Sequence, residues 1–431
     1  MIKQYNTMEN KLYTRELNFN SAKIKFNFVD ILVILCLIFY EAGSFGLPLN
    51  LYQFIIVGIL AILLTKKLYS GQKISISIKL VAILGYMALI TAFNQFDSKV
   101  ITGFIFFVIE IFALYFWMSE DRNFVKTQKI IYGVAVFLSI YGVIQEIAFL
   151  LDWQVIYDLT LYGFPSSPDE IRNGFLSVSS FYSEPSHCVN FISWGLWIGL
   201  TQYKKKNYVS APKNLIIVLC AFLTQSAIVY ISCIVVLFAY LFIYKKGIRE
   251  KVRYLCVVVF AGMAVMVIAG DMFVGVISRL TQFLDISTTT SNDLSALAIV
   301  SNFQIAIEKM KDGFLFGTGF DTHRIYYFSY IKKIYGSLIM YLNIEDAGTL
   351  FTRIFSEFGI VGLAIFILAI LKQLFKSIKK NDMNKFSFLL IFLLIIMRNG
   401  QYENIYTVLT FLGAFIVSSN KGEEANEKYK S

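Results

Sequence analysis

Between residues 130 and 151 the chain reads IIYGVAVFLSIYGVIQEIAFLL, an apolar run in which Glu146 is the only charged residue. A helix needs roughly 20 mainly apolar residues to cross the hydrocarbon core of a bilayer, so this run predicts a transmembrane helix. The whole chain of 431 residues has the same character, because 57% of its residues are hydrophobic, 16% are charged and the mean hydropathy is +0.63. Soluble domains carry about 25% charged residues. We therefore expect a membrane protein.

Similar apolar runs recur along the sequence and predict about twelve transmembrane helices, hence an all-α polytopic fold with one large, partly helical outer loop. The run at 215–244 is too long for one span, and we interpret it as two short helices that turn at Thr224-Gln225-Ser226. The expected runs are 28–46, 51–64, 78–93, 100–118, 130–151, 187–202, 215–244 (two helices), 254–269, 347–371, 386–397 and 405–417. The expected organisation is a cytoplasmic segment at 1–27, helices one to nine within 28–269 with an outer loop at 152–186, a large periplasmic or extracellular loop at 270–346, helices ten to twelve within 347–418, and a cytoplasmic tail at 419–431.

Basic residues gather in the short loops between these runs, and this helix count places every lysine and arginine cluster on one side. The positive-inside rule assigns that side to the cytoplasm. The net charge of +10 therefore indicates topology. Since no basic stripe with interleaved aromatic residues occurs in a polar segment, we expect no nucleic-acid partner.

The five cysteines lie inside or at the ends of apolar runs, and none forms a Cys-x-x-Cys pair. Neither a disulfide framework nor a zinc site is indicated. The sequence has only two histidines, which are too few for a zinc site without further ligands. We expect no metal and no cofactor. The first residues lack an apolar core before a small-residue cleavage site, so we expect no cleaved signal peptide.

The loop at 152–186 is acidic, and Arg172 is its only basic residue. It ends in Glu184-Pro185-Ser186-His187, and Pro185 stands where proline favours the first turn of a helix. A carboxylate and an imidazole are therefore expected beside a helix N-terminus at the outer membrane boundary. Such an N-terminus attracts anions, including phosphates.

The loop at 270–346 has structure of its own. Apolar spacing predicts a helix over 294–311, and Gly313 stands where that helix would stop. A tight turn is expected at Gly317-Thr318-Gly319, before Asp321-Thr322-His323-Arg324. The aromatic residues of 326–341 are typical of a membrane interface.

Three local patterns resemble integral-membrane polysaccharide polymerases of the Wzy type (O-antigen or capsule polymerases), which are relatives of the O-antigen ligases. The first is Arg172-x-Gly174 followed by Glu184-Pro185-Ser186. The second is Arg279-Leu280, an amphipathic helix and Gly317-Thr318-Gly319. The third is the run from Glu357 to Gly362 in the span that follows. Together with the spans they cover most of the chain in order.

This resemblance implies a glycosyltransferase that joins undecaprenyl-diphosphate-linked oligosaccharide units outside the bacterial cytoplasmic (inner) membrane without a metal. The growing chain would leave its lipid carrier when a sugar hydroxyl of the incoming unit attacks it. Two positions depart from relatives. Asp346-Ala347-Gly348-Thr349 stands where ligases often carry His-Asn, and no arginine lies between Leu294 and Glu308. The expected partners are the lipid-linked oligosaccharide, membrane lipid and a chain-length regulator.

Displacement of a diphosphate requires cations, and guanidinium groups suit phosphate because they are planar, bidentate and always charged. Five arginines are predicted on the outer side and are candidates for diphosphate binding: Arg172, Arg279, Arg324, Arg353 and Arg398. Two have structural alternatives. Arg353 could pair with Glu357 one helical turn later, and Arg398 could extend to the membrane surface.

The candidate catalytic residues are Glu184, His187 and His323, all predicted on the outer side. An imidazole near its ordinary pKa suits a general base at neutral pH. Glu184 would orient the acceptor sugar or accept its proton, whereas its structural alternative is stabilisation by the helix dipole. Each histidine could equally be structural.

Two other functions remain open. One is a ligase-type transferase that moves the polymer to another acceptor. The other is a flippase or transporter for lipid-linked oligosaccharides. Transporters usually show related halves and interrupted helices. This sequence has no obvious repeat and devotes roughly 75 residues to one outer loop, which favours an enzyme.

Overall fold

A computed structural model describes residues 26–41, 50–94, 97–120, 123–164, 171–172, 174–203, 205–244, 252, 294–336 and 342–417. The span predicted at 254–269 and the part of the large loop before residue 294 lie outside these residues. All the structural statements below refer to the described part of the chain.

The fold is all-α, as predicted, with one two-stranded antiparallel sheet among the described residues. Its strands are β1 (Ile171–Arg172) and β2 (Phe175–Leu176), paired so that Arg172 lies opposite Phe175. The helices are α2 (Phe28–Phe39), α3 (Leu51–Tyr69), α4 (Ile78–Asn94), α5 (Ser98–Ser119), α6 (Asn123–Leu150), α7 (Gln154–Tyr157), η1 (Leu159–Tyr162), η2 (Pro185–Cys188), α8 (Val189–Thr201), α9 (Ala211–Leu223), α10 (Ala227–Ala239), η3 (Tyr240–Tyr244), α13 (Leu294–Lys311), α14 (His323–Tyr335), α15 (Leu350–Lys379), α16 (Met383–Ile396), α17 (Ile405–Phe411) and η4 (Leu412–Ile416).

Five described segments are long and apolar enough to cross a membrane: Leu51–Tyr69, Ser98–Ser119, Lys126–Leu150, Ala227–Tyr244 and Leu350–Lys379. Shorter apolar helices accompany them at Phe28–Phe39, Ile78–Asn94, Ala211–Leu223, Met383–Ile396 and Ile405–Ile416. The protein is therefore a polytopic membrane protein. The total of about twelve spans stays a prediction.

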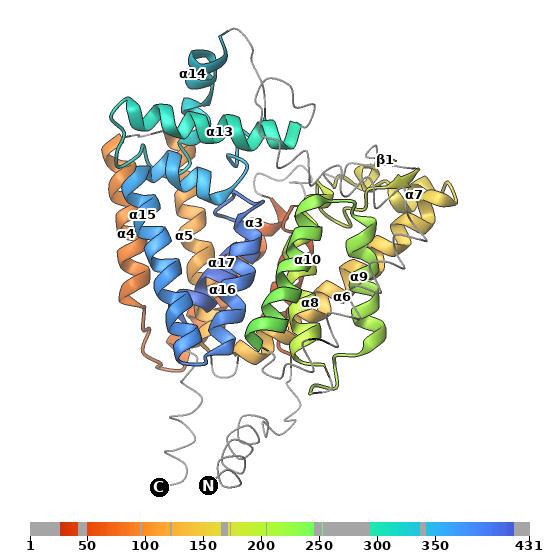
Figure 1. Cartoon of the computed structure of the whole chain (residues 1–431). Coiled ribbons are helices and arrows are strands. Elements are labelled where there is room, and N and C mark those ends of the chain that lie inside the picture. The colour runs from red at the N-terminus through yellow and green to blue at the C-terminus, as the bar shows by residue number, and fades with distance from the viewer. Residues whose placement is uncertain are drawn as a thin grey trace.

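The helices stand side by side, and the two loop regions lie at one end of the bundle (Figure 1). In this view α13 lies across the upper end of α15, α14 rises above it, and α7 and β1 occupy the same end on the other side. Helix α8 is almost completely buried, with only Leu200 partly exposed, and it packs against α6, α9, α10 and α16. The two predicted outer regions therefore share one end of the molecule.

The segment 211–244 folds as the sequence predicted. Helix α9 ends at Leu223, α10 begins at Ala227, and the turn between them contains Gln225 with φ +49°. The Thr224 hydroxyl donates to the Ala221 carbonyl oxygen at 2.8 Å. This bond satisfies one of the carbonyl groups that a helix end leaves unpaired.

The predicted helix over 294–311 is α13, and the glycine turn after it docks onto a break in α15. At the break Gly359 has φ +64° and ψ −171°, a conformation restricted essentially to glycine. The backbone N–H groups of Thr318 and Gly319 donate to the Glu357 carbonyl oxygen at 2.9 and 2.7 Å. A side chain at Gly359 would begin 2.0 Å from the Leu315 carbonyl oxygen. The glycine turn of the second sequence pattern is therefore packed directly against the third pattern.

Candidate functional site

The turn between α16 and α17, residues 397–404, lies between two groups of charged side chains. We name the first the Arg398 cluster (Glu41, Glu184, His187, Asp346 and Arg398) and the second the Arg353 cluster (Asp321, Arg324, Arg353, Glu357 and Tyr402). Asn404 fixes the far end of this turn, because its side chain accepts from the Tyr406 and Thr407 N–H groups. Both clusters therefore depend on the same short connection.

In the Arg398 cluster the guanidinium joins the two loop regions. Arg398 forms an ion pair with Glu184, and its Nε donates to the Ser186 hydroxyl at 2.8 Å. A third partner is Asp346, whose Oδ2 lies 3.7 Å from Arg398 Nη1. Burial raises the pKa of the Glu184 carboxyl, but the guanidinium of Arg398 outweighs this and holds it below its ordinary value. The Glu184 side chain is still 49% exposed, so it can leave the guanidinium when another anion arrives.

His187 is held by a carboxylate that the sequence did not indicate. Its Nδ1 lies 2.7 Å from Glu41 Oε1, while Glu41 Oε2 accepts from the Ser183 N–H at 2.6 Å and from the Ser183 hydroxyl at 2.7 Å. Burial lowers the pKa of the His187 imidazole, but Glu41 overcomes this and raises it above its ordinary value. Burial in turn raises the pKa of the Glu41 carboxyl, but His187 outweighs the burial. The pKa of Glu41 is therefore lowered to about 2. With Nδ1 directed at Glu41, Nε2 is the nitrogen left to exchange a proton.

In the Arg353 cluster the guanidinium has a partner at every nitrogen. Arg353 donates to Glu357 Oε1 at 3.1 Å, to Asp321 Oδ1 at 2.6 Å and to the Gly400 carbonyl oxygen at 3.1 Å. Its face also lies over the Tyr402 ring, 4.6 Å from the centroid. The side chain is only 6% exposed. The predicted ion pair between Arg353 and Glu357 is therefore confirmed, and this arginine joins α15 to Asp321, just before α14, and to the 397–404 turn.

Arg324 differs from Arg353 although both contact the same aspartate. Its Nε donates to Asp321 Oδ2 at 3.1 Å, and its side chain is 22% exposed. Asp321 Oδ1 belongs to Arg353. Arg324 therefore keeps free donor capacity at the edge of the cluster.

His323 is buried and fully hydrogen-bonded. Its Nδ1 lies 2.8 Å from the Ser356 hydroxyl and its Nε2 lies 2.7 Å from Asn302 Oδ1, so the ring joins α15 to α13. Burial lowers the pKa of His323 well below its ordinary value, and the cations Lys309 and Arg353 lower it further. The ring is therefore neutral at physiological pH, and both its nitrogens are engaged.

Lys309 completes the buried junction. Its ammonium donates to the Thr318 hydroxyl at 2.8 Å and to the Ser356 hydroxyl at 3.1 Å, and it lies 4.6 Å from the Tyr326 ring centroid. Burial lowers the pKa of Lys309 to about 7. These contacts fix α13 to the glycine turn and to α15.

The structure thus divides the predicted site residues into two groups. Glu184, His187 and Arg398 meet in one cluster, whereas Arg324 and Arg353 meet in the other, with His323 packed behind it. Arg172 lies in β1, but its side chain is outside the described part of the chain, as is all of Arg279.

Sequence reasoning missed four members of the clusters: Glu41, Asp321, Asp346 and Tyr402. Two had a signal, because Asp321 follows the glycine turn and Asp346 occupies the position that departs from relatives. Glu41 lies inside the run expected at 28–46, but nothing in that run pointed to His187, which it meets only through the fold. No group of three or more histidine, cysteine, aspartate or glutamate side chains in the described residues could hold a metal ion.

Fold and site together define a polytopic α-helical membrane protein with two arginine-centred clusters at one end of its bundle. Residues 214–367 match the family model Wzy_C, described as O-antigen ligase, and this match supports membership of the Wzy/O-antigen ligase superfamily. The match runs from α9 to α15 and so includes most of the Arg353 cluster. No curated protein matches the chain. The match supports a membrane enzyme of the O-antigen ligase and polymerase type, connected with polysaccharide biosynthesis.

Proposed function

We propose that this enzyme is a polysaccharide polymerase that joins undecaprenyl-diphosphate-linked oligosaccharide units at the outer face of the cytoplasmic membrane. The observation that carries the proposal is the Arg398 cluster. There a guanidinium with an exchangeable partner lies beside a carboxylate-supported imidazole. The cluster surrounds the N-terminal turn that precedes α8, where backbone N–H groups favour a phosphate.

The proposed step needs one base and one anion site. A hydroxyl oxygen of the acceptor sugar bonds to the anomeric carbon of the donor chain, and the bond from that carbon to the diphosphate oxygen breaks. The hydroxyl proton passes to His187 Nε2, and the diphosphate departs on its lipid with the bonding electron pair. Arg398 stabilises the charge that develops on the leaving group, because fixed donors in a site from which water is excluded act strongly on such charge.

Glu41 and Glu184 assist in different ways. Glu41 holds the His187 ring in the tautomer that leaves Nε2 available and stabilises the imidazolium formed in the step. Glu184 occupies Arg398 until the diphosphate displaces it, and it then contacts the acceptor sugar. Neither role requires a metal.

We assign the Arg353 cluster a positioning role, with Arg324 at its edge as a second contact for the diphosphate. Arg353 donates to the Gly400 carbonyl oxygen, two residues beyond Arg398. It therefore fixes the backbone that carries the catalytic guanidinium. Arg172 and Arg279 stay candidates for diphosphate binding on the strength of their sequence patterns.

A ligase that transfers a finished polymer to a different lipid acceptor is the second candidate, favoured by the description of the matching family model. One experiment separates the two. Purified protein in lipid nanodiscs receives a lipid-diphosphate-linked repeat unit, alone or with a lipid acceptor of the other class. A ladder of products from the repeat unit alone supports the polymerase.

A single transfer that requires the second acceptor identifies a ligase instead. The His187→Gln variant serves as the negative control, since it removes the base while keeping a hydrogen-bonding side chain of similar size. No glycosyl product from either acceptor would overturn the enzymatic proposal. Movement of intact lipid-linked units between leaflets would then identify a flippase.

A further inference from the structure

A cavity lies away from both clusters, between α2, α6 and the segment that leads into α9. Its volume is about 440 Å³, within the range of about 300–1,000 Å³ that small-ligand sites occupy. The walls are mostly apolar, with Ile34 and Ile38 on α2 and Val134 and Phe137 on α6. We name this cavity the α2–α6 groove.

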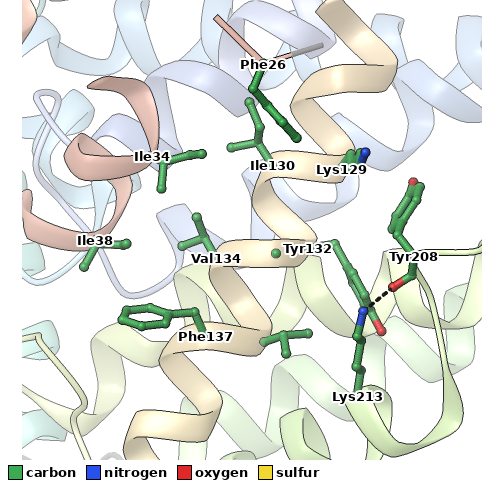
Figure 2. Close-up of a pocket in the computed structure, with 12 residues that line it drawn as sticks. Phe26, Ile34, Ile38, Lys129, Ile130, Tyr132, Val134, Phe137, Tyr208 and Lys213 are labelled. Atoms are coloured by element: carbon green, nitrogen blue, oxygen red, sulfur yellow. Dashed lines mark hydrogen bonds between the residues drawn. The ribbon is translucent and has the colours of Figure 1, made fainter. Parts of the chain in front are cut away.

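One side of the groove is cationic. Figure 2 shows Lys129 and Lys213 on the side of Tyr208, opposite the isoleucines of α2. Lys213 donates to the Tyr208 carbonyl oxygen at 3.0 Å, and Lys129 lies 5.0 Å from the Phe26 ring centroid. Neither lysine forms an ion pair with a described carboxylate. Nearby Lys126 differs, because Asp30 lies 2.5 Å from its ammonium group.

We propose that the α2–α6 groove binds an anionic phospholipid, with its acidic head group on the side of the groove that carries Lys129 and Lys213 and an acyl chain against the apolar wall of α2 and α6. The charge pattern favours this ligand, since two cations without an ion-pair partner among the described carboxylates lie along one side of an apolar channel and match an acidic head group on a hydrocarbon tail. The distance along α6 from Lys129 to Phe137 is about 12 Å, long enough for a substantial part of one acyl chain. Phe137 is 47% exposed, so the groove opens onto the apolar surface from which a lipid would enter.

The site is distinct from the proposed catalytic one. It lies near the start of α6, whereas β2 and the loop after it, which carry the chain towards Glu184, pack near the other end of that helix. The bound lipid would fasten α2 to α6, and the chain reaches Glu41 directly after α2. The groove is therefore a structural lipid site on the helix that leads to the His187 partner.

Gly133 permits a direct test. A Cβ added there meets no atom within 4 Å, so the Gly133→Trp side chain starts from open space and projects its ring from the groove wall. Gly85 in α4 is exposed and equally open, and Gly85→Trp is the matched control. Protein purified from nanodiscs that contain equal amounts of phosphatidylglycerol and phosphatidylcholine is analysed by native mass spectrometry. We expect one retained phosphatidylglycerol on the wild type and on Gly85→Trp, and none on Gly133→Trp.

The charge test uses two double variants that lose the same charge. Each basic residue near an anionic membrane raises the binding constant about fivefold. The Lys129→Gln/Lys213→Gln variant should therefore retain phosphatidylglycerol roughly 30-fold less well than the wild type. The control, Lys372→Gln/Lys379→Gln on exposed positions of α15, should match the wild type. Equal retention of the two lipids by the wild type would overturn the proposal, as would unchanged retention by the groove variant.

A photo-crosslinking amino acid at Phe137 identifies the occupant directly. An adduct with phosphatidylglycerol supports the proposal. A crosslink to peptides from residues 1–25 in its place overturns it, because the groove would then hold a segment of this chain. Thermal unfolding of each variant shows whether it has folded, and the crosslinking result does not depend on substitution of any lysine.

Discussion

The Arg398 and Arg353 clusters flank the same turn, yet their central guanidinium groups are in opposite states. Arg353 is 6% exposed and has protein acceptors at all its nitrogens and a ring against its face. Arg398 is 15% exposed, and its main partner, Glu184, is half exposed. A buried cation whose nitrogens are all engaged by protein groups stabilises a fold, whereas a cation with an exchangeable partner can receive a substrate. The presence of an arginine on the outer side therefore does not identify the substrate site. What identifies it is whether the arginine's protein partner can be displaced by a substrate.

The largest effect is expected at Gly359, where the glycine turn docks onto α15 beside the Arg353 cluster. The Gly359→Ala change places an L-residue in a strained conformation that costs about 1–3 kcal/mol. The clash 2.0 Å from the Leu315 oxygen costs roughly 1–3 kcal/mol more, and displacement of the docked turn loses the hydrogen bonds from Thr318 and Gly319 to the Glu357 carbonyl oxygen at about 1 kcal/mol each. The control Gly313→Ala also has positive φ (+96°) but meets no atom within 4 Å. Thermal unfolding in detergent should show a far greater loss for Gly359→Ala. Equal losses would mean that the docked turn does not matter.

The second effect tests Arg353 itself. Removing one partner of a buried ion pair leaves an uncompensated charge, so Arg353→Ala should lower the free energy of unfolding by about 3–5 kcal/mol. Arg324→Ala removes a partly exposed partner of the same aspartate and should cost less than about 1 kcal/mol. Denaturant unfolding of both variants measures the contrast. A small loss for Arg353→Ala would contradict the positioning role.

The difference between the clusters also marks what the sequence could predict. Local patterns were sufficient for α13, for the turn between α9 and α10, and for the pair of Arg353 with Glu357, because these depend on periodicity, length and a four-residue spacing. The same holds for proline at the start of η2. Each of these features lies within a short stretch of chain.

Partners that are distant in sequence could not be predicted. The Arg398–Glu184 pair joins positions 214 residues apart, and Glu41 reaches Ser183 across 142 residues. Such pairs follow from helix packing, which no local pattern encodes. The sequence alone therefore allowed Arg398 to be interpreted as a surface residue. It could not show that the partners of Arg353 are fixed whereas the main partner of Arg398, Glu184, can be displaced.

The third effect tests Arg398 on activity. Removal of one donor to a developing charge typically costs about 10²–10³ in rate, so Arg398→Ala should lose transfer activity by that factor while thermal unfolding changes little. Arg398→Lys keeps the charge but not the planar fork, and should recover only part of the rate. Product formation from the lipid-diphosphate-linked unit measures both variants. Wild-type rates for Arg398→Ala would remove the guanidinium from the proposed step.

The smallest effect concerns pH and the Glu41–His187 pair. His187 must be neutral to accept a proton, and Glu41 raises its pKa, so the acid limb of the kcat/KM profile should lie above about pH 6.5. In Glu41→Gln the raising charge is lost while burial still lowers the pKa. The limb should therefore move to lower pH. A limb that does not move would exclude His187 as the base.

The pH dependence of the free energy of unfolding tests the Glu41–His187 pair without an activity measurement. The raised pKa of His187 contributes stability that is complete below its unfolded value of about 6.5 and is lost as pH rises through the folded value. The lowered pKa of Glu41 contributes stability above about pH 4.5 that is lost as pH falls towards about 2. The stability difference between wild type and Glu41→Gln should therefore be greatest at about pH 5–6 and smaller at pH 8. If the pair instead behaved like that of Arg353, whose cation does not titrate in this range, the difference would stay constant from pH 5 to pH 8.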